Sequence, residues 1–364
     1  MSEVVASPKH SCPSCGAQAQ WEPATQTLRC PFCATVSQFH ETATGEIQEN
    51  DLATALRSIP DSQRGWAPEQ ITVKCQSCQA ISVFSAGRVA QRCDFCGSPA
   101  LVPYTETQAP IRPESVLPFK IAEATIRETI RQWYGSHWLA PNKLKSRALT
   151  DTLHGAYLPY WTFDAQAHAD WTAEAGHHYY ETQSYRDANG RTQTRQVQKT
   201  RWVPASGSLD HFFDDTLVSG SRGVPADLLA EVEPFPTTTD LVPYSTAFLS
   251  GWVVEQYQID LVAALQHARA TMHSQLETLC SREVPGDTQR GLQVEADYTG
   301  QTFKHILVPV WLLTYTYGSK NFVVVINGYT GKIAGKYPLS WVKILLISLA
   351  VLLLLGIIIA ASQK

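Results

Sequence analysis

The longest apolar run of the chain lies close to its C-terminal end. Residues 344–361 carry no charge, and with Trp341 and Val342 they can cross a bilayer as a helix of roughly 30 Å. A core helix of this length would carry a polar face, and this run has none. The pattern predicts a single-pass C-terminal transmembrane helix in residues 339–364, a tail anchor with Trp341 at the membrane interface.

Upstream, apolar residues recur at helical spacing in two long segments, residues 121–134 and residues 258–280. We expect the apolar stripe of each helix to pack on the core of a domain. Two shorter helices are predicted. One spans residues 52–57, where Asn50 or Asp51 can cap its first turn, and the other spans residues 143–153.

Aromatic and β-branched segments predict the strands. These are residues 155–164 with an extension at 168–171, a polar hairpin at 177–202 that turns at Asn189-Gly190, and residues 307–315, 322–326 and 332–336. By contrast, residues 209–224 have the pattern of a loop, and the proline-rich residues 225–250 are expected to be irregular.

Two strand motifs indicate an internal duplication. Leu158-Pro159-Tyr160-Trp161 and Val308-Pro309-Val310-Trp311 resemble each other, and each follows helical sequence. Residues 105–338 are therefore predicted to form one α+β domain around an antiparallel sheet.

The cysteines add metal chemistry to this picture, because eight of the nine stand in four Cys-x2-Cys pairs. Both quartets have the spacing Cys-x2-Cys-x14-Cys-x2-Cys. Two tight turns of this kind can place four thiolates at the corners of a tetrahedron, which is the closed coordination of a structural zinc site. We predict two structural Zn²⁺ ions, held by Cys12, Cys15, Cys30 and Cys33 and by Cys75, Cys78, Cys93 and Cys96.

The residues around both quartets fit two small β-rich zinc ribbons. Gly16 and Gly97 each follow a cysteine pair, where a positive φ is often needed. The predicted organisation is ribbon one in residues 1–40, a linker with a short helix in 41–70, ribbon two in 71–104, the α+β domain in 105–338 and the anchor in 339–364. Segments this short need the metal to hold their fold.

Disulfides and iron–sulfur ligation are the alternatives to zinc. Disulfides need an oxidising compartment, and the N-terminus does not have the pattern of a signal peptide. Four thiolates can also hold iron, so that alternative stays open.

The charge distribution limits the classes of partner. The net charge is −4, and residues 1–104 hold 7 Lys and Arg against 9 Asp and Glu. Ribbons that grip phosphates should be basic, which disfavours a bulk nucleic-acid binder but leaves a local patch of Arg29, Arg88 and Arg92. The hairpin at 177–202 is the most basic soluble segment. It is either an ordinary solvated ribbon or a contact surface for an acidic partner or lipid headgroups.

No catalytic motif is found in the sequence. A P-loop, a nucleotide-binding glycine fingerprint, His-Glu-x-x-His and Gly-x-Ser-x-Gly are all absent. The best cluster is Asp164, His168, Asp170, His177 and His178, in which His168 and Asp170 would share a strand face. A metal or acid/base pair is conceivable there, but an ordinary polar sheet face with satisfied side chains is the simpler explanation. The unpaired Cys280 is expected to be a small buried hydrophobic residue near a helix end.

Charges around the apolar run predict its orientation. Lys332, Lys336 and Lys343 precede it, and Lys364 follows it. The positive-inside rule places the large N-terminal part in the cytoplasm, at the inner membrane. Reduced cysteines require the same compartment.

The motifs together resemble a known bacterial family. They are the two ribbons, the Leu-Pro-Tyr-Trp-Thr-Phe-Asp strand at 158–164, the Val-Pro-Val-Trp strand with its Asn-Gly-Tyr-Thr-Gly turn at 327–331, and the anchor. The chain resembles membrane-anchored double zinc-ribbon proteins of the transcription factor IIB type, also labelled primosomal helicase-like, over most of its length. This resemblance implies association with relatives of phage-shock protein A and with stomatin/flotillin-type membrane proteins. It implies no catalytic residues, and no helicase motor motif is present.

These observations favour a non-enzymatic adaptor or scaffold that docks partner proteins in an envelope-stress or membrane-maintenance complex. The expected contact residues are exposed ribbon aromatics, namely Trp21, Phe32, Phe39 and Phe84. The alternative is a membrane-tethered nucleic-acid binder that uses the three arginines and the ribbon aromatics. A third reading is an enzyme that works through the face of Asp164, His168 and Asp170.

Overall fold

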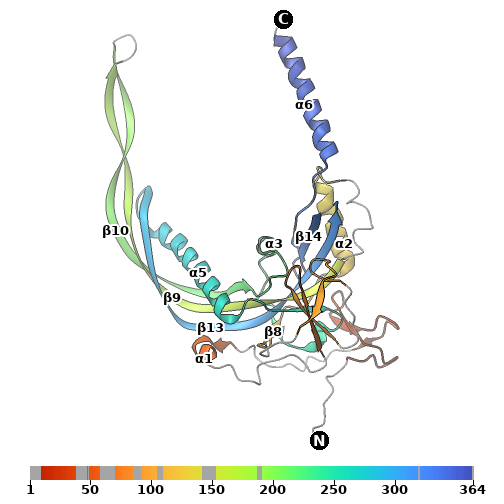
Figure 1. Ribbon diagram of the computed structural model, residues 1–364. Coiled ribbons are helices and arrows are strands. Elements are labelled where there is room, and N and C mark those ends of the chain that lie inside the picture. Colours follow the sequence, from red (N-terminus) through yellow and green to blue (C-terminus); the bar gives the residue numbers. More distant parts are fainter. Residues whose placement is uncertain are drawn as a thin grey trace.

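Three very long strands organise the molecule. The computed structural model describes residues 10–37, 47, 49–57, 70–85, 92–104, 110–141, 153–186, 191–318 and 320–362. Strand β9 (Leu153–Arg186) lies between β10 (Thr192–Ser219) and β13 (Thr288–Tyr317), antiparallel to both. Figure 1 shows these strands curving like a cradle, with the β9–β10 hairpin rising at one end and α6 at the other.

Short strands extend this cradle into a mixed sheet, which has 12 strands in the described part of the chain. The sequence predicted a purely antiparallel sheet, but β8 runs parallel to β13 and β12 runs parallel to β9. The added strands are β4 (Asn50–Asp51), β5 (Gln70–Cys75), β6 (Ile81–Ser85), β7 (Leu101–Pro103), β8 (Ser115–Val116), β11 (Val242–Pro243), β12 (Val253–Gln256), β14 (Lys320–Asn327) and β15 (Ile333–Gly335). A separate three-stranded sheet consists of β1 (Gln20–Glu22), β2 (Thr27–Arg29) and β3 (Val36–Ser37).

The described helices are α1 (Leu52–Arg57), α2 (Glu123–Ser136), α3 (Ala226–Val232), α4 (Thr246–Leu249), α5 (Leu261–Glu283) and α6 (Trp341–Ser362). Four of them agree with the sequence pattern, but α3 and α4 lie in residues 225–250, where the sequence predicted irregular structure. Asp51 caps α1 as predicted, because its Oδ1 accepts a hydrogen bond from the Thr54 backbone N–H at 2.7 Å. Almost all of the helix predicted at 143–153 lies outside the described residues, and residue 153 already begins β9.

The loop predicted at 209–224 is wrong, because β10 continues through most of it to Ser219. The ladder with β9 shifts register between Phe213 and Thr216, which marks a β-bulge. Asp215 lies in this bulge with a φ of 51° and is buried. The bulge breaks the period of two that identifies a strand, which explains why the sequence resembled a loop.

A stripe of alanines lies under α5. Every second residue from Ala165 to Ala175 is buried, and each is alanine except Trp171. Side chains of α5, among them Met272 and Cys280, pack on this stripe. Small residues let the helix approach the strand closely. The full burial of Cys280 confirms the expected small hydrophobic role.

The pairing of the strands and the hydrogen bonds between the two units show the predicted duplication. The units β8-α2-β9 and β12-α5-β13 have the same order, and the first strand of each pairs in parallel with the last strand of the other. Trp161 Nε1 donates to the Ile259 carbonyl at 2.9 Å, and Trp311 Nε1 donates to the Ile121 carbonyl at 3.3 Å. The two units are therefore related by an approximate twofold axis and are intertwined.

The strand that follows each repeated strand, β10 or β14, ends in the same backbone contact. The Gly220 N–H donates to the Pro159 carbonyl at 2.8 Å, and the Gly328 N–H donates to the Pro309 carbonyl at 2.9 Å. The prolines of the two matching motifs therefore serve the same backbone contact in both units.

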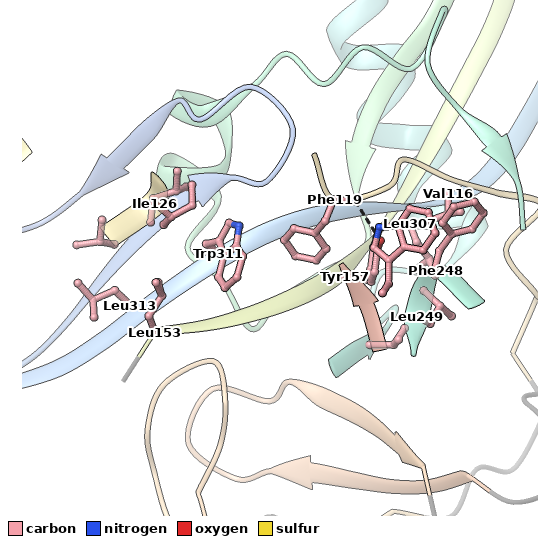
Figure 2. Close-up of a cluster of buried hydrophobic side chains, with 14 of the residues drawn as sticks. Val116, Phe119, Ile126, Leu153, Tyr157, Phe248, Leu249, Leu307, Trp311 and Leu313 are labelled. Atoms are coloured by element: carbon pink, nitrogen blue, oxygen red, sulfur yellow. Dashed lines mark hydrogen bonds between the residues drawn. The ribbon is translucent and has the colours of Figure 1, made fainter. Parts of the chain in front are cut away.

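An aromatic core joins α2 to the sheet. The Phe119 ring lies 5.3 Å from the Trp311 ring and 5.1 Å from the Tyr157 ring, between centroids. Figure 2 shows these three rings in a row, with Ile126 of α2 at one end of the cluster. The Tyr157 hydroxyl accepts a hydrogen bond from the Phe119 backbone N–H at 3.2 Å, so the buried phenol is satisfied.

The base of α6 is attached to the segment that follows α2. Lys343 Nζ donates to the carbonyls of Trp138, at 2.8 Å, and Ala140, at 2.7 Å. Side chains of Trp138 and Trp341 are exposed beside this base. The helix is apolar, and none of its side chains from Trp341 to Ile359 is buried, which is consistent with a single-pass membrane anchor.

Candidate metal centres and the surfaces around them

The eight predicted cysteine ligands come together in two clusters. The first cysteine cluster is Cys12, Cys15, Cys30 and Cys33, and the second cysteine cluster is Cys75, Cys78, Cys93 and Cys96; in each, the sulfurs all lie within 4.8 Å of one another. The Cys12 and Cys33 sulfurs are 3.4 Å apart, and those of Cys75 and Cys96 are 3.6 Å apart. A tetrahedral ion with sulfur ligands requires about 3.8 Å between sulfurs. Each cluster can therefore hold one metal ion.

The four turns that carry the sulfurs share one backbone design. In each, the residue after the turn donates its N–H to the carbonyl of the first cysteine, at 2.8 to 3.0 Å. These four residues have φ values between 59° and 74°, and they are Gly16, Ala34, Gln79 and Gly97. The two glycines were predicted, whereas Ala34 and Gln79 hold the same left-handed conformation with a side chain.

A second layer of hydroxyl groups repeats in both clusters. Thr35 Oγ1 lies 3.0 Å from Ser14 Oγ, and Ser98 Oγ lies 2.8 Å from Ser77 Oγ. The Thr35 hydroxyl, 3.2 Å from the Cys33 sulfur, lowers the pKa of this thiol to about 6. A hydroxyl that favours the thiolate supports metal binding, because the thiolate is the ligand.

The first module, residues 10–37 around the first cysteine cluster, is docked on the body through its backbone. The Trp21 N–H donates to the Ser250 carbonyl at 3.0 Å, and Ser250 Oγ donates to the Ala19 carbonyl at 2.6 Å. The Trp21 ring lies 4.7 Å from Phe248, edge to face. The prediction of Trp21 as an exposed contact residue is therefore wrong, since only 4 % of it is exposed.

The second module, residues 70–85 and 92–104 around the second cysteine cluster, is part of the main sheet. Its strand β6 pairs with β12 of the body, so the module continues the sheet that contains β9. Phe84, predicted to be exposed, is buried at 4 % exposure. Phe39 and Arg88 lie outside the described residues.

One equivalent pair of residues distinguishes the two modules. Phe32 and Phe95 occupy the same position in their second Cys-x2-Cys turns. Phe95 is 0 % exposed and packs in the core of the body, whereas Phe32 is 82 % exposed. Pro13, Pro31 and Val36 of the first module are also exposed. The first module therefore presents an exposed apolar tip, whereas the second module buries the phenylalanine at the equivalent position.

The predicted His and Asp cluster is divided between different environments. His168 and Asp170 do share a face, with Nε2 to Oδ1 at 3.8 Å, and His168 Nδ1 lies 2.7 Å from Asp210 Oδ1. Asp210 raises the pKa of His168 by this hydrogen bond. All three side chains are exposed, as are those of an ordinary polar sheet face. His178 lies farther along β9, where its Nδ1 is 3.0 Å from Thr200 Oγ1; His177 precedes it.

Asp164 belongs instead to a buried ion cluster that the sequence did not reveal. Lys304 Nζ lies 2.9 Å from Asp215 Oδ1, 3.0 Å from Glu49 Oε1 and 3.8 Å from Asp164 Oδ2. Burial raises the pKa of Asp164 to about 6. Together with Asp214, the two aspartates have metal-compatible spacing, but the Lys304 ammonium already pairs with Asp164 and Asp215. The sequence held one sign of this ion cluster: Lys304 is a charged residue in the otherwise apolar run that includes Phe303 and continues from Ile306.

Arg29, proposed for nucleic-acid contact, is paired with Glu22 at 3.3 Å. Arg92 is exposed. In the described surface of the first module, the charge of Arg29 is therefore already compensated by Glu22, which disfavours phosphate binding there.

Comparison with known proteins adds one relative of unassigned role. No protein-family model and no solved structure matches the chain. Among curated proteins, it is similar to the uncharacterized protein YdjG of Bacillus subtilis (strain 168), at 25 % identity over 236 residues. The match covers 64 % of this chain and spans 66 % of the length of that protein. Function must therefore be argued from geometry.

Proposed function

We propose that the chain is a non-enzymatic adaptor, anchored in the cytoplasmic membrane with its body on the cytoplasmic side. Each cysteine cluster holds one structural Zn²⁺, and the first module docks a partner protein. The observation that carries this proposal is the contrast between Phe32, which is 82 % exposed, and its buried equivalent Phe95.

The buried Phe95 demonstrates what such a side chain does when a surface is available. It inserts into the core formed by the body, where it lies with Leu158 and Val310. Phe32 has no such surface within the described part of this chain, so it is free to insert into a partner. Burying one phenylalanine contributes about 1.5–3 kcal/mol, and aromatic anchors of this kind dominate interfaces.

The metal chemistry supports a structural rather than a catalytic role. Four cysteine sulfurs surround each centre, so no ligand position is left for a substrate or a reactive water. Closed four-thiolate coordination is typical of structural zinc. The family resemblance proposes the partner class, namely relatives of phage-shock protein A or stomatin/flotillin-type membrane proteins within an envelope-stress complex.

Site-specific photocrosslinking tests the proposal. A photoreactive phenylalanine analogue at position 32 of the full chain, expressed in cells, should crosslink to a defined protein partner. The analogue at position 212 is the matched control, since Phe212 is also exposed but lies in β10. Recovery of the crosslinked protein with the intact chain should fall at least about tenfold in Phe32→Ser, as for an interface hot spot.

The control variant Phe212→Ser should leave recovery unchanged, and both variants should unfold at the wild-type temperature. If Phe32→Ser recovers the same proteins in the same amounts, the docking proposal is wrong.

A further inference from the structure

The β9–β10 hairpin continues beyond the rest of the sheet as a two-stranded arm. Strand β13 last pairs with β9 at Gly176, and α5 ends at Glu283. We call residues 177–186 and 192–202 the arm. Its strands stay paired from Arg201 opposite His177 out to Thr192 opposite Arg186. At about 3.3 Å per residue it extends roughly 30 Å beyond the sheet.

Three of the four basic residues of the arm lie on one face, and the fourth, Arg186, lies on the other face at the far end of the arm, opposite Thr192. Directly opposed residues of an antiparallel pair point to the same side, and successive residues alternate. One face therefore carries Arg201, Lys199 and Arg195. Between these positions the other face carries uncharged pairs only, listed here along the arm: His178 and Thr200, Tyr180 and Gln198, Thr182 and Gln196, Ser184 and Thr194. We call the first side the basic face.

Tyrosines alternate with the basic residues on this face. Tyr179 lies opposite Lys199, and Tyr185 lies within 5.6 Å of the Arg195 guanidinium, measured to the ring centroid. These two rings are 46 % and 45 % exposed. The single acid of the face, Glu181, pairs with Lys199. Cationic groups beside half-exposed tyrosines match a layer that is anionic at its surface and apolar beneath.

The arm rises on the side of the curved sheet from which α6 leaves (Figure 1). We propose that the basic face binds the anionic phospholipid headgroups of the bilayer that α6 enters. This inference rests on α6 spanning a bilayer and goes beyond the docking role of the first module. The arm leaves the sheet at Gly176, beyond the last pair with β13, and binding of its basic face requires the arm to tilt toward the plane of the headgroups.

Hydrogen exchange of the full chain in nanodiscs tests the inference. One copy per disc is compared in phosphatidylcholine alone and in equal parts of phosphatidylcholine and phosphatidylglycerol. Arm peptides should exchange at least about tenfold more slowly in the anionic discs, as expected for several basic groups at a charged surface. High salt should remove the difference. Peptides of α6 should be protected in both lipids, which reports anchoring separately from arm binding.

Two variants of equal charge sharpen the test. Arg195→Gln/Lys199→Gln/Arg201→Gln should lose the lipid-dependent protection. Arg29→Gln/Arg57→Gln/Arg222→Gln removes the same charge elsewhere and should keep it. Equal exchange in both lipids overturns the inference while leaving the anchor intact, whereas unprotected α6 overturns both. Protection of the arm that requires two copies per disc would assign the basic face to a second copy of the chain. Protection that appears only with an added oligonucleotide would assign it to a nucleic acid. Either result also overturns the inference.

Discussion

Single residues of the metal-binding turns differ in how well they suit a backbone that all four turns share. The left-handed conformation costs a residue with a side chain about 1–2 kcal/mol, and glycine avoids this cost. Gly16 therefore suits its turn, whereas Ala34 at φ 59° is strained in the equivalent turn of the same module. The sequence showed the glycines but could not show that alanine occupies the same conformation.

We expect Ala34→Gly to stabilise the metal-loaded protein by about 1 kcal/mol, because it relieves this strain. Gly16→Ala should destabilise it by a similar amount. No atom lies within 4 Å of a Cβ added at Gly16, so the effect comes from the backbone alone. Thermal unfolding of the two variants checks the pair, and shifts of the same sign would contradict the explanation.

Glu255 on β12 is a buried carboxyl beside Ala80 and Gly223. Burial raises its pKa from 4.5 to about 8. Because the native state then binds the proton more tightly than the unfolded state, this group favours folding at low pH. Its contribution is lost as the pH rises from about 4.5 toward 8, by at most about 1.4 kcal/mol per pH unit.

We therefore expect Glu255→Gln to flatten the fall in stability between about pH 5 and pH 8. Urea unfolding of both proteins across this range measures the slopes. Glu114, whose pKa burial raises to about 7, contributes a slope of the same sign in both proteins. Identical slopes for wild type and variant would show that Glu255 is not the source.

At the residue scale, the sequence identified what depends on residue type and spacing. The eight cysteines and the shared face of His168 and Asp170 were predictable for this reason. Exposure was not predictable: Trp21 and Phe84 were expected to be exposed contact residues, and both are buried. Which surface docks on the body depends on partners hundreds of residues away, such as Ser250 for Trp21.

Among the secondary-structure elements, the long strands were predicted only as shorter pieces, and the short strands β8, β11 and β12 were not predicted. β9 and β10 interrupt their apolar alternation with alanines and a bulge, so the sequence pattern divided each strand into pieces. The bulge at Asp215 buries a carboxylate where a loop was expected. Only Lys304 of β13, which lies across β9 from β10, explains why that position is polar.

The alanine stripe under α5 gives a prediction at this scale. We expect Ala169→Leu to destabilise the protein by about 1–3 kcal/mol, because the fully buried site has no room for a longer side chain. Thr172→Leu on the exposed face of the same strand should change stability by about 0.5 kcal/mol or less. Chemical denaturation compares them, and equal effects would mean that α5 does not pack closely on β9.

At the scale of the whole molecule, the two cysteine clusters differ in how much of the fold depends on each of them. The first module contacts the body through its surface, whereas the second module contributes β5, β6 and β7 to the main sheet. Two metal ions should therefore have unequal effects on the body. This asymmetry could not be read from two quartets of identical spacing.

We expect the purified chain to carry two zinc ions, measured by native mass spectrometry, and to lose one in each of Cys12→Ser and Cys75→Ser. Cys75→Ser should also speed hydrogen exchange across β9 and β13, because β6 and the buried Phe95 are lost from the body. Cys12→Ser should leave those strands protected. Equal loss of protection in both variants would contradict the asymmetry.

The crossed pairing of the two repeats also has a consequence for biosynthesis. Ser115 and Val116 acquire their parallel partners only when Ile306 and Leu307 have been synthesised. Contacts so distant along the chain form slowly, after much of the polypeptide has left the ribosome. By then translation has nearly reached α6, so this apolar helix is synthesised while the sheet is still incomplete. Chaperones that shield both the unpaired strands and the apolar helix during this interval should decide how much intact protein accumulates.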